Sequence, residues 1–340
     1  MAPAVRLLLP LTWPWLLLAL EGLVHWNDGP GLLGALELMG LLLGLPDLNG
    51  LACWSCMRPW SSIPIRDCAE PLCDLPPQLW RLQPHPYVLL GAPYGPQGSP
   101  FRLRYGVIER LLLAQAHLQR QAAHWRLAIF DGWRPLAVQS FMVEHTIAEL
   151  CAARQLDRHL PAVASACAAA STDTVSSTDT VASTDTVAST DRGASTDAGA
   201  LEHSVDLEHS AALEQVIADV GRFWATPSDD PATPPPHSTG AAVDLSLADA
   251  AGKPLAMGSP IDAIGAVSEP NHFAAVAAAC SDSAERLQAL QWHRRRQLLA
   301  AAMKEAGFEQ HPNEWWHFSW GDQMWAWRSG SAQAHYGRTF

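Results

Sequence analysis

The order of hydrophobic and polar positions predicts helices and strands in the middle of the chain. Residues 107–123 carry apolar side chains at helical spacing with arginines and glutamines between them, which indicates an amphipathic helix. The short apolar run 126–130 ends in an Asp-Gly pair and is typical of a buried strand that closes in a turn. A second helix is expected over 136–153, because Pro135 favours the first position of a helix.

Two further strands are expected in the C-terminal part of the chain. In residues 242–247 a valine and two leucines alternate with other residues, so Asp244 points away from the hydrophobic face of the strand. Residues 314–318 are aromatic enough for a buried strand. Glu314 and His317 are three positions apart, so they share a face in a helical turn and diverge on a regular strand. The sequence leaves their arrangement in space open.

Residues 282–306 give the clearest helical pattern. Asp282 followed by Glu285 resembles a capping box, and Gly307 stands where a helix ends. Arg294-Arg295-Arg296 are expected on the solvated side of this helix. The expected apolar stripe consists of Leu287, Leu290, Leu298, Leu299 and Met303.

The first fifty residues contain two apolar runs, 7–20 and 32–45. Each run is shorter than the roughly 20 residues that a membrane-spanning helix needs. An export signal, a membrane-associated hairpin and an upstream extension all fit this pattern. We therefore predict an apolar N-terminal extension over 1–61, with membrane contact only if this segment is retained. Whether this segment acts as an export or anchor segment decides between the cytoplasm and the periplasm or cell envelope as the location of the protein.

Residues 171–200 form a tandem Ser-Thr-Asp repeat with a period of six residues. A β-helix would need a regular large aliphatic residue in each unit, and the repeat has none. We predict a disordered low-complexity insertion over 160–212, carried as a surface loop by a domain that spans 62–330. Residues 331–340 are expected to form a tail.

Composition and charge narrow the classes of partner. The chain has 340 residues and a formal charge of 22 − 34 = −12, which argues against a nucleic-acid partner. The cysteine count of seven does not suggest a disulfide framework. Four of the cysteines could form a small structural metal site, although no histidine helps and the second pair lacks a turn signal: Cys53, Cys56, Cys68 and Cys73. The oligomeric state is not predicted.

Residues with metal-binding and proton-transfer chemistry gather in two stretches. Pro234-Pro235-Pro236 lead to His237, and Gly240 allows a bend before Asp244. Two histidines and two carboxylates suit a catalytic zinc site, in which three side chains hold the metal and a further carboxylate handles protons. Taken alone, residues 314–317 are better explained by a core aromatic strand with a hydrogen-bonded histidine. Arg134, at a strand-to-helix corner, either points into a site or is a surface arginine.

The motifs in order resemble the D-alanyl-D-alanine dipeptidase family of zinc peptidases, the relatives of the vancomycin-resistance dipeptidase. The resemblance covers roughly residues 63–327, and the repeat and the first fifty residues are not expected from it. The motifs are Phe130-Asp131-Gly132-Trp133-Arg134-Pro135, His237-Ser238-Thr239-Gly240-Ala241-Ala242-Val243-Asp244-Leu245, Met257-Gly258-Ser259-Pro260-Ile261-Asp262 and Glu314-Trp315-Trp316-His317.

The resemblance implies a fold and a set of roles. It implies a single α+β domain with a central antiparallel sheet that carries a mononuclear zinc site and has helices packed on it. Glu314 would be the general base and acid, Arg134 would polarise the substrate carbonyl and stabilise the oxyanion, and Asp262 would receive the free amino group. One catalytic Zn²⁺ would be bound by His237, Asp244 and His317.

The implied function is hydrolysis of the D-alanyl-D-alanine dipeptide by a metal-activated water, in peptidoglycan precursor turnover. The expected partner is thus a small dipeptide. Two alternatives remain at this point. One is a zinc D,D-carboxypeptidase or endopeptidase that acts on cell-wall peptides, and the other is a non-catalytic zinc-fold module that binds the cell wall or a protein.

Overall fold

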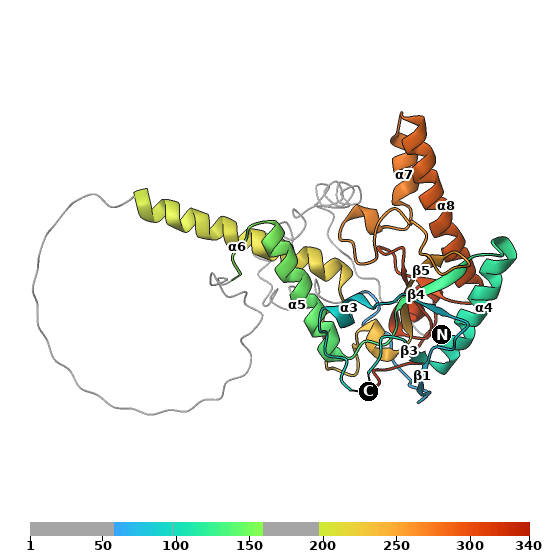
Figure 1. The fold of residues 1–340 in the computed structure, drawn as a ribbon. Helices are drawn as coiled ribbons and strands as arrows, with labels where there is room; N and C mark the ends of the chain where they lie inside the picture. Colours follow the sequence, from blue (N-terminus) through green and yellow to red (C-terminus); the bar gives the residue numbers. More distant parts are fainter. Residues whose placement is uncertain (1–57, 97, 159–196) are drawn as a thin grey trace, which may run out of the picture. The chain divides into compact units, whose positions relative to one another are not determined.

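A five-stranded sheet lies at the centre of the computed structural model, which describes residues 58–96, 98–158 and 197–340. The strand order is β2-β4-β5-β7-β6, and Figure 1 labels its neighbouring strands β4 and β5. The parallel pair is β2 and β4, and the other neighbours are antiparallel. This confirms the predicted α+β class with a largely antiparallel central sheet. The strands are β2 (Trp80–Arg81), β4 (Arg126–Asp131), β5 (Ala242–Ala248), β7 (His317–Ser319) and β6 (Glu309–Gln310).

Strand β5 is the centre of this sheet and is buried along its whole length. Its aliphatic side chains Val243, Leu245 and Leu247 join the main hydrophobic core, as their alternation predicts. Asp244 and Ser246 therefore face the other side of the sheet. The antiparallel register with β7 pairs Asp244 with His317, so these two polar residues are cross-strand neighbours.

The predicted helices are confirmed, but the exposure of several α8 side chains differs from the prediction. Helix α4 (Tyr105–Gln121) and helix α8 (Ser283–Glu305) contribute buried residues to the main core. Asp282 caps α8 by accepting hydrogen bonds from the backbone N–H groups of Ala284 and Glu285. Arg296 was expected on the solvated side but is 1% exposed. Two leucines of the expected apolar stripe are instead exposed, Leu287 and Leu290.

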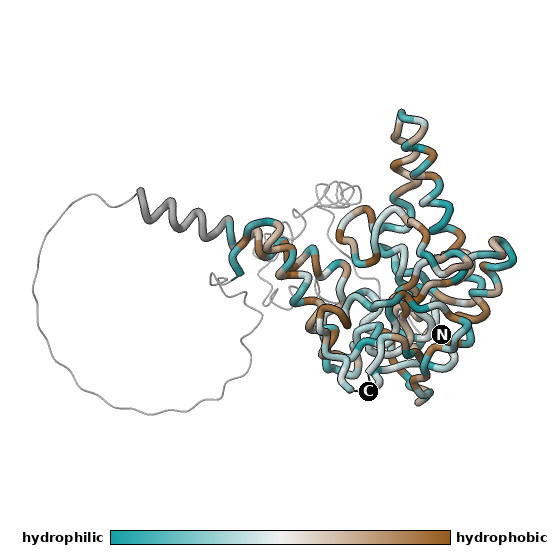
Figure 2. The backbone as a smooth tube through the Cα atoms, viewed as in Figure 1, coloured by the Kyte–Doolittle hydropathy of each residue, from teal (hydrophilic) through white to brown (hydrophobic). Residues whose placement is uncertain are grey.

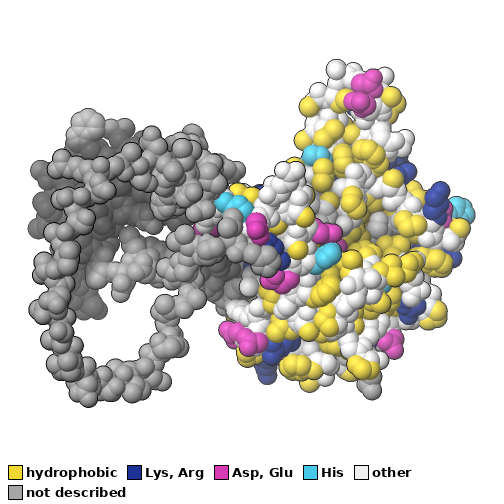
Figure 3. All heavy atoms as spheres, turned by 60° about the vertical axis from the view of Figure 1, so that its left-hand side comes forward, with side chains coloured by type: hydrophobic (Ala, Val, Ile, Leu, Met, Phe, Trp, Pro, Cys, Tyr) yellow, Lys and Arg dark blue, Asp and Glu magenta, His cyan; other side chains and the backbone are white. Residues whose placement is uncertain are grey.

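The exposure of those leucines follows from the position of the helical pair that α8 forms with α7 (His272–Ala279). The two helices lie side by side and extend beyond the sheet (Figure 1). Hydrophobic and hydrophilic positions alternate along them (Figure 2), and acidic side chains stand at their tip (Figure 3). A small cluster around Phe273 and Ala289 holds the pair together, so the outer turns have few neighbours to cover the leucines.

A second hydrophobic cluster lies between α5 (Leu136–Ala153) and α6 (Asp197–Phe223). Val138 and Met142 of α5 belong to it together with Val216 and Val220 of α6. The expectation of a disordered insertion over 160–212 is therefore wrong for 197–212, where the backbone is helical. The apolar residues of α6 that pack in this cluster stand at helical spacing just after residue 212. The rest of the repeat lies outside the described residues.

Both ends of the expected domain also differ from the prediction. The compact unit runs from Arg58 to Phe340, so residues 58–61 belong to it and Trp60 is buried. The supposed tail 331–340 packs into the same unit, where Tyr336 is buried and the backbone N–H of Thr339 donates to Ser238 O at 3.0 Å. Short elements complete this part of the chain: β1 (Leu72–Asp74), α3 (Pro86–Leu89), β3 (Arg102–Arg104), η3 (Pro236–Thr239), η4 (Ala266–Ser268) and α9 (Gln323–Ser329).

The questions about the N-terminal segment fall on residues 1–57, which lie outside the described part of the chain. The same holds for Cys53 and Cys56, so the possible four-cysteine site is untested. Cys68 and Cys73 are free thiols. Among the described residues, no helix combines the length and the hydrophobicity that crossing a membrane requires.

Candidate active site

His237 is delivered to the site by a short 3-10 helix, η3, which follows three prolines. The helix ends at Gly240, whose φ of 71° is left-handed and whose missing Cβ would meet Leu72 at 2.4 Å. The carbonyl of Gly132 lies 2.7 Å from His237 Nδ1. Because a carbonyl only accepts, Nδ1 carries the proton and the Nε2 lone pair is free to bind a metal.

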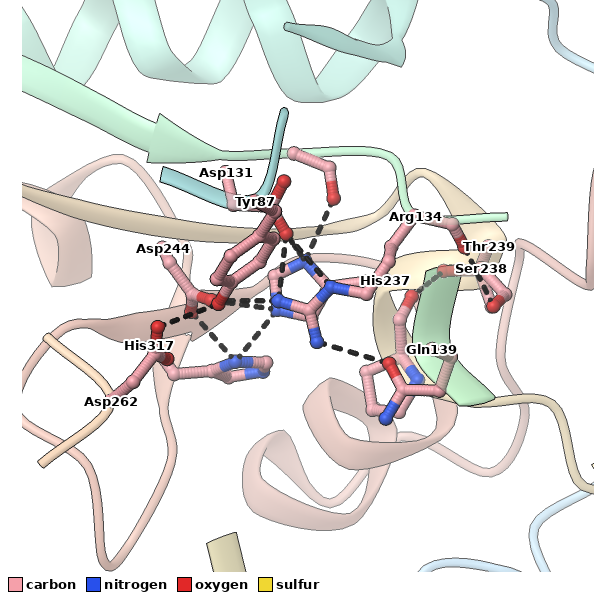
Figure 4. A network of polar contacts seen from close by, with 12 residues as sticks. Tyr87, Asp131, Arg134, Gln139, His237, Ser238, Thr239, Asp244, Asp262 and His317 are labelled. Carbon is pink, nitrogen blue, oxygen red and sulfur yellow. Dashed lines mark hydrogen bonds and ion pairs between the residues drawn. The ribbon is translucent and has the colours of Figure 1, made fainter. Parts of the chain in front are cut away.

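Strands β5 and β7 bring two further donor groups to His237 (Figure 4). Asp244 Oδ2 lies 3.1 Å from His237 Nε2, and Asp244 Oδ1 lies 3.0 Å from His317 Nδ1. The two imidazole nitrogens are 3.2 Å apart. The three residues are buried, and their ligand atoms lie within 4.8 Å of one another, so they could hold a metal ion. Burial alone would raise the pKa of Asp244, but the two histidines, His237 foremost, hold it well below its usual range.

Glu314 lies just before the bend that leads into β7, not on the strand itself. This answers how residues three positions apart converge, because the alternation of a strand does not apply to the bend. Glu314 Oε2 lies 3.7 Å from His317 Nδ1, and Oε1 lies 3.6 Å from His311 Nδ1. Oε1 is buried without a hydrogen-bond partner among the described residues. Burial, reinforced by Asp244, raises the pKa of Glu314 well above its usual range.

Arg134 is buried at the corner between β4 and α5, so the alternative of a surface arginine is wrong. Its Nε and Nη2 donate to Asp131 Oδ2 at 2.9 and 2.7 Å, and its Nη1 donates to Gln139 Oε1 at 3.0 Å. Nη2 also reaches Asp244 Oδ2 at 3.3 Å. The guanidinium is therefore fixed beside the donor cluster with most of its N–H groups in use.

Asp262 lies in the loop between β5 and α7 and has a left-handed backbone, with φ of 64°. Its Oδ2 accepts a hydrogen bond from the hydroxyl of Tyr87 at 2.6 Å, as Figure 4 shows. Burial and the charge of Asp244 raise the pKa of Asp262 to about 7. The same loop brings its carboxylate to the cavity that the donor cluster lines.

Comparison with known proteins identifies the family of this chain. The family described as Peptidase_M15, D-ala-D-ala dipeptidase, matches residues 210–336. A protein of Synechocystis sp. named D-alanyl-D-alanine dipeptidase is 36% identical over 290 residues, which covers 83% of this chain and 97% of the relative. The chain belongs to the D-alanyl-D-alanine dipeptidase family. It is therefore a peptidase, and the alternative of a non-catalytic binding module does not agree with this membership.

In this protein, all six predicted site residues line one cavity. The lining includes the three donor residues together with Glu314, Arg134 and Asp262. Arg134 lies outside the segment that the family match covers, yet the fold brings it within 3.3 Å of Asp244.

Asp131 is a further member of the site that the sequence did not single out. It is fully buried, and besides Arg134 it accepts a hydrogen bond from Tyr94 at 3.0 Å and lies 3.4 Å from His85 Nε2. A register shift between Ile129 and Asp131 places Asp131 opposite Asp244 on the neighbouring strand. Burial opposes ionisation of Asp131, but Arg134 holds its pKa below the usual range. The Asp-Gly pair after an apolar run was visible in the sequence, but the bulge was not.

The loop that carries Asp262 is held from behind by Arg296 of α8. This guanidinium has no carboxylate within 4.0 Å among the described residues, and burial lowers its pKa to about 9. It lies over the rings of Phe273 and Trp315 at 4.7 and 5.0 Å. Its hydrogen bonds, each 2.9 or 3.0 Å long, go to Met257 O, Ser259 Oγ, Val267 O and Glu269 O.

The remaining wall of the cavity comes from residues that the sequence pattern predicts outside the domain or gives no signal for. Arg58, Trp60 and His311 line it together with Trp224. Trp60 packs edge-on against His311 with ring centroids 5.8 Å apart. No motif marks these residues, because they come together only through the tertiary fold.

Proposed function

We propose that this peptidase hydrolyses the D-alanyl-D-alanine dipeptide and uses zinc to do so. The observation that carries the proposal is the convergence of His237 Nε2, Asp244 Oδ1 and Oδ2, and His317 Nδ1, with closest approaches between residues of 3.0 to 3.2 Å, next to a buried carboxylate with a free oxygen. Two imidazoles and one carboxylate are a donor set of catalytic zinc sites, in which the fourth position stays open. The protonated Nδ1 of His237 supports the fit, because it leaves Nε2 as a ligand.

A zinc ion at these ligands would supply a Lewis acid that makes water acidic enough to act as a nucleophile near neutral pH. The protein's own groups would then handle protons and charge. We assign to Glu314 the transfer of the proton from the attacking water to the leaving amine. Burial raises the pKa of Glu314, which makes its carboxylate a stronger base than an exposed one.

Arg134 is the group that we assign to the substrate carbonyl. Its buried guanidinium stays charged, and it can donate to the oxygen on which negative charge develops during attack. Asp131 contributes indirectly, because its carboxylate fixes the guanidinium through two hydrogen bonds at 2.9 and 2.7 Å. We infer that Asp131 is a positioning residue, since it points to Arg134 and not to the cavity.

Asp262 is the group that we assign to the free amino end of the dipeptide. An ammonium loses its water when it enters a buried site, and a carboxylate partner offsets that cost. Tyr87 holds the carboxylate through the 2.6 Å hydrogen bond to Oδ2. This pair of residues favours the dipeptidase over a zinc D,D-carboxypeptidase or endopeptidase, whose substrates have no free amine next to the scissile bond. Turnover of peptidoglycan precursors is the process that such a reaction would serve.

The test is hydrolysis of D-alanyl-D-alanine by the metal-loaded full-length protein, measured as free D-alanine. The Glu314→Gln variant keeps the size of the side chain but cannot take a proton. It should retain zinc, measured on the same preparation, and lose about 10²- to 10⁴-fold in kcat. A chelated sample should be inactive and should recover when zinc is added.

Two results would contradict the proposal. Equal D-alanine release from the wild type, the Glu314→Gln variant and the chelated sample would show that the measured activity does not come from this site. Cleavage of an N-acetylated cell-wall peptide at a higher kcat/KM than the free dipeptide would favour the carboxypeptidase or endopeptidase alternative.

A further inference from the structure

The charges of the proposed substrate leave one group without a partner. A free dipeptide carries an ammonium at one end and a carboxylate at the other. The proposed function gives the ammonium to Asp262 and the scissile carbonyl to Arg134. Burying a carboxylate is costly unless a cation or several N–H donors receive it. The cavity should therefore contain a second cation that is not already neutralised.

Arg134 is not that cation. It donates to the carboxylates of Asp131 and Asp244 and to the amide oxygen of Gln139. Four of the five N–H groups of a guanidinium account for these contacts. Its charge is balanced by two carboxylates, and its remaining donor suffices for one carbonyl oxygen.

Arg58, unlike Arg134, is a cation that no carboxylate neutralises among the described residues. It lines the cavity, and no carboxylate of the described residues lies within 4.0 Å of it. Its Nη2 donates to Gly221 O at 2.8 Å and Trp224 O at 2.9 Å, and its Nη1 to Arg222 O at 3.5 Å. These carbonyls at the end of α6 fix the guanidinium in place without neutralising it. Two of its five N–H groups remain for a ligand.

A series of side-chain contacts connects Arg58 with Glu314. Its guanidinium lies 5.7 Å from the ring centroid of Trp60, which packs against His311, and His311 lies 3.6 Å from Glu314. Arg58, Glu314 and Asp262 line the same cavity. One cavity therefore offers a cation and a carboxylate to the two ends of a short substrate, with the proposed base in the same lining.

We propose that Arg58 binds the C-terminal carboxylate of the dipeptide. This inference rests on the proposed function and adds the second end of the substrate to it. It also gives a physical reason for the length of the substrate. With Asp262 at the amine and Arg58 at the carboxylate, a peptide extended at either end would lose one charge pair.

The test compares D-alanyl-D-alanine with its C-terminal amide, which has the same shape but no negative charge. The readout is the ratio of kcat/KM for the acid to kcat/KM for the amide, measured on metal-loaded full-length protein. In the wild type the acid should be preferred by about ten- to a hundredfold, the range of hydrogen bonds to charged groups. Arg58→Gln should bring the ratio close to one by slowing the acid alone. Arg58→Lys should give an intermediate ratio, because it keeps the charge and loses the planar fork.

Arg222→Gln is the matched control, since Arg222 is an exposed arginine of the same helix end that does not line the cavity. Its ratio should equal that of the wild type. A wild-type ratio near one would overturn the inference without any variant. Equal losses for acid and amide in Arg58→Gln and Arg58→Lys would also overturn it, because they would show that Arg58 only caps α6. If the wild type does not hydrolyse the free dipeptide at all, the proposed function itself fails, and the inference falls with it.

Discussion

Two walls of the same cavity are built in different ways. The donor wall, formed by His237, Asp244 and His317, stands on paired strands and on a short helix fixed by Gly240. The substrate wall, formed by Arg58, Trp60, Trp224 and Asp262, comes from a domain edge, a helix end and a loop. The pairing of β5 with β7 fixes the positions of the donor residues. The positions of the substrate-wall residues depend instead on packing between distant segments.

Under the proposed function, this difference separates the residues of the reaction from the residues that select the substrate. A metal site tolerates little displacement of its ligands, so paired strands suit it. Substrate recognition can change with loops while the sheet stays the same. Substitutions in the donor wall should therefore abolish activity towards every substrate, and substitutions in the substrate wall should change which substrates are favoured.

The largest expected effect comes from the donor wall. His317→Ala removes one of the three proposed ligands and leaves His237 and Asp244 without the partner that both contact. The variant should lose bound zinc, measured by metal analysis. Loss of the general base is expected to lower kcat by about 10²- to 10⁴-fold, and the loss of activity in His317→Ala should be larger. His145→Ala, on the partly exposed side of α5, serves as the control and should keep both metal and activity. Full zinc content in His317→Ala would mean that this residue is not a ligand.

A smaller effect is expected where the two walls meet, at Arg134. Arg134→Lys keeps a positive charge but cannot donate in parallel to Asp131, so the charge that faces the carbonyl is misplaced. We expect a loss of about 10²- to 10³-fold in kcat with metal content unchanged. Arg126→Lys, at the other end of β4, is the matched control. A loss seen only in KM would place Arg134 in the substrate wall instead of at the reacting carbonyl.

The smallest effect in this series is a change in pH dependence from Asp262. Only the ionised carboxylate attracts an ammonium, and the pKa of Asp262 is raised to about 7. The value of kcat/KM for the dipeptide should therefore fall as the pH drops through 7, or through a lower value where a bound metal ion favours the ionised form. Asp262→Asn should lower kcat/KM and remove this part of the profile. An unchanged profile in the variant would assign the acid limb to another group.

The donor wall was predictable from sequence because its residues lie in local motifs. Asp244 follows from the alternation of residues in β5, and the approach to His237 is marked by prolines and Gly240. The position of Glu314 was not predictable, since it depends on where β7 begins. Asp131 required a bulge that no residue pattern announces. The sequence predicts Arg58 and Trp60 within the N-terminal extension, because no local pattern marks them and the oxygens that bind Arg58 lie more than 150 residues away in the chain.

Arg296 has a consequence for how the amine subsite could change. One guanidinium on α8 holds backbone or side-chain oxygens of four residues in the loop around Asp262, yet α8 does not line the cavity. A substitution at this helix position would release the loop without touching the substrate or the metal ligands. Selection for a new dipeptide could therefore act on a residue that no inspection of the cavity would choose, and a mutational library for altered specificity should include position 296.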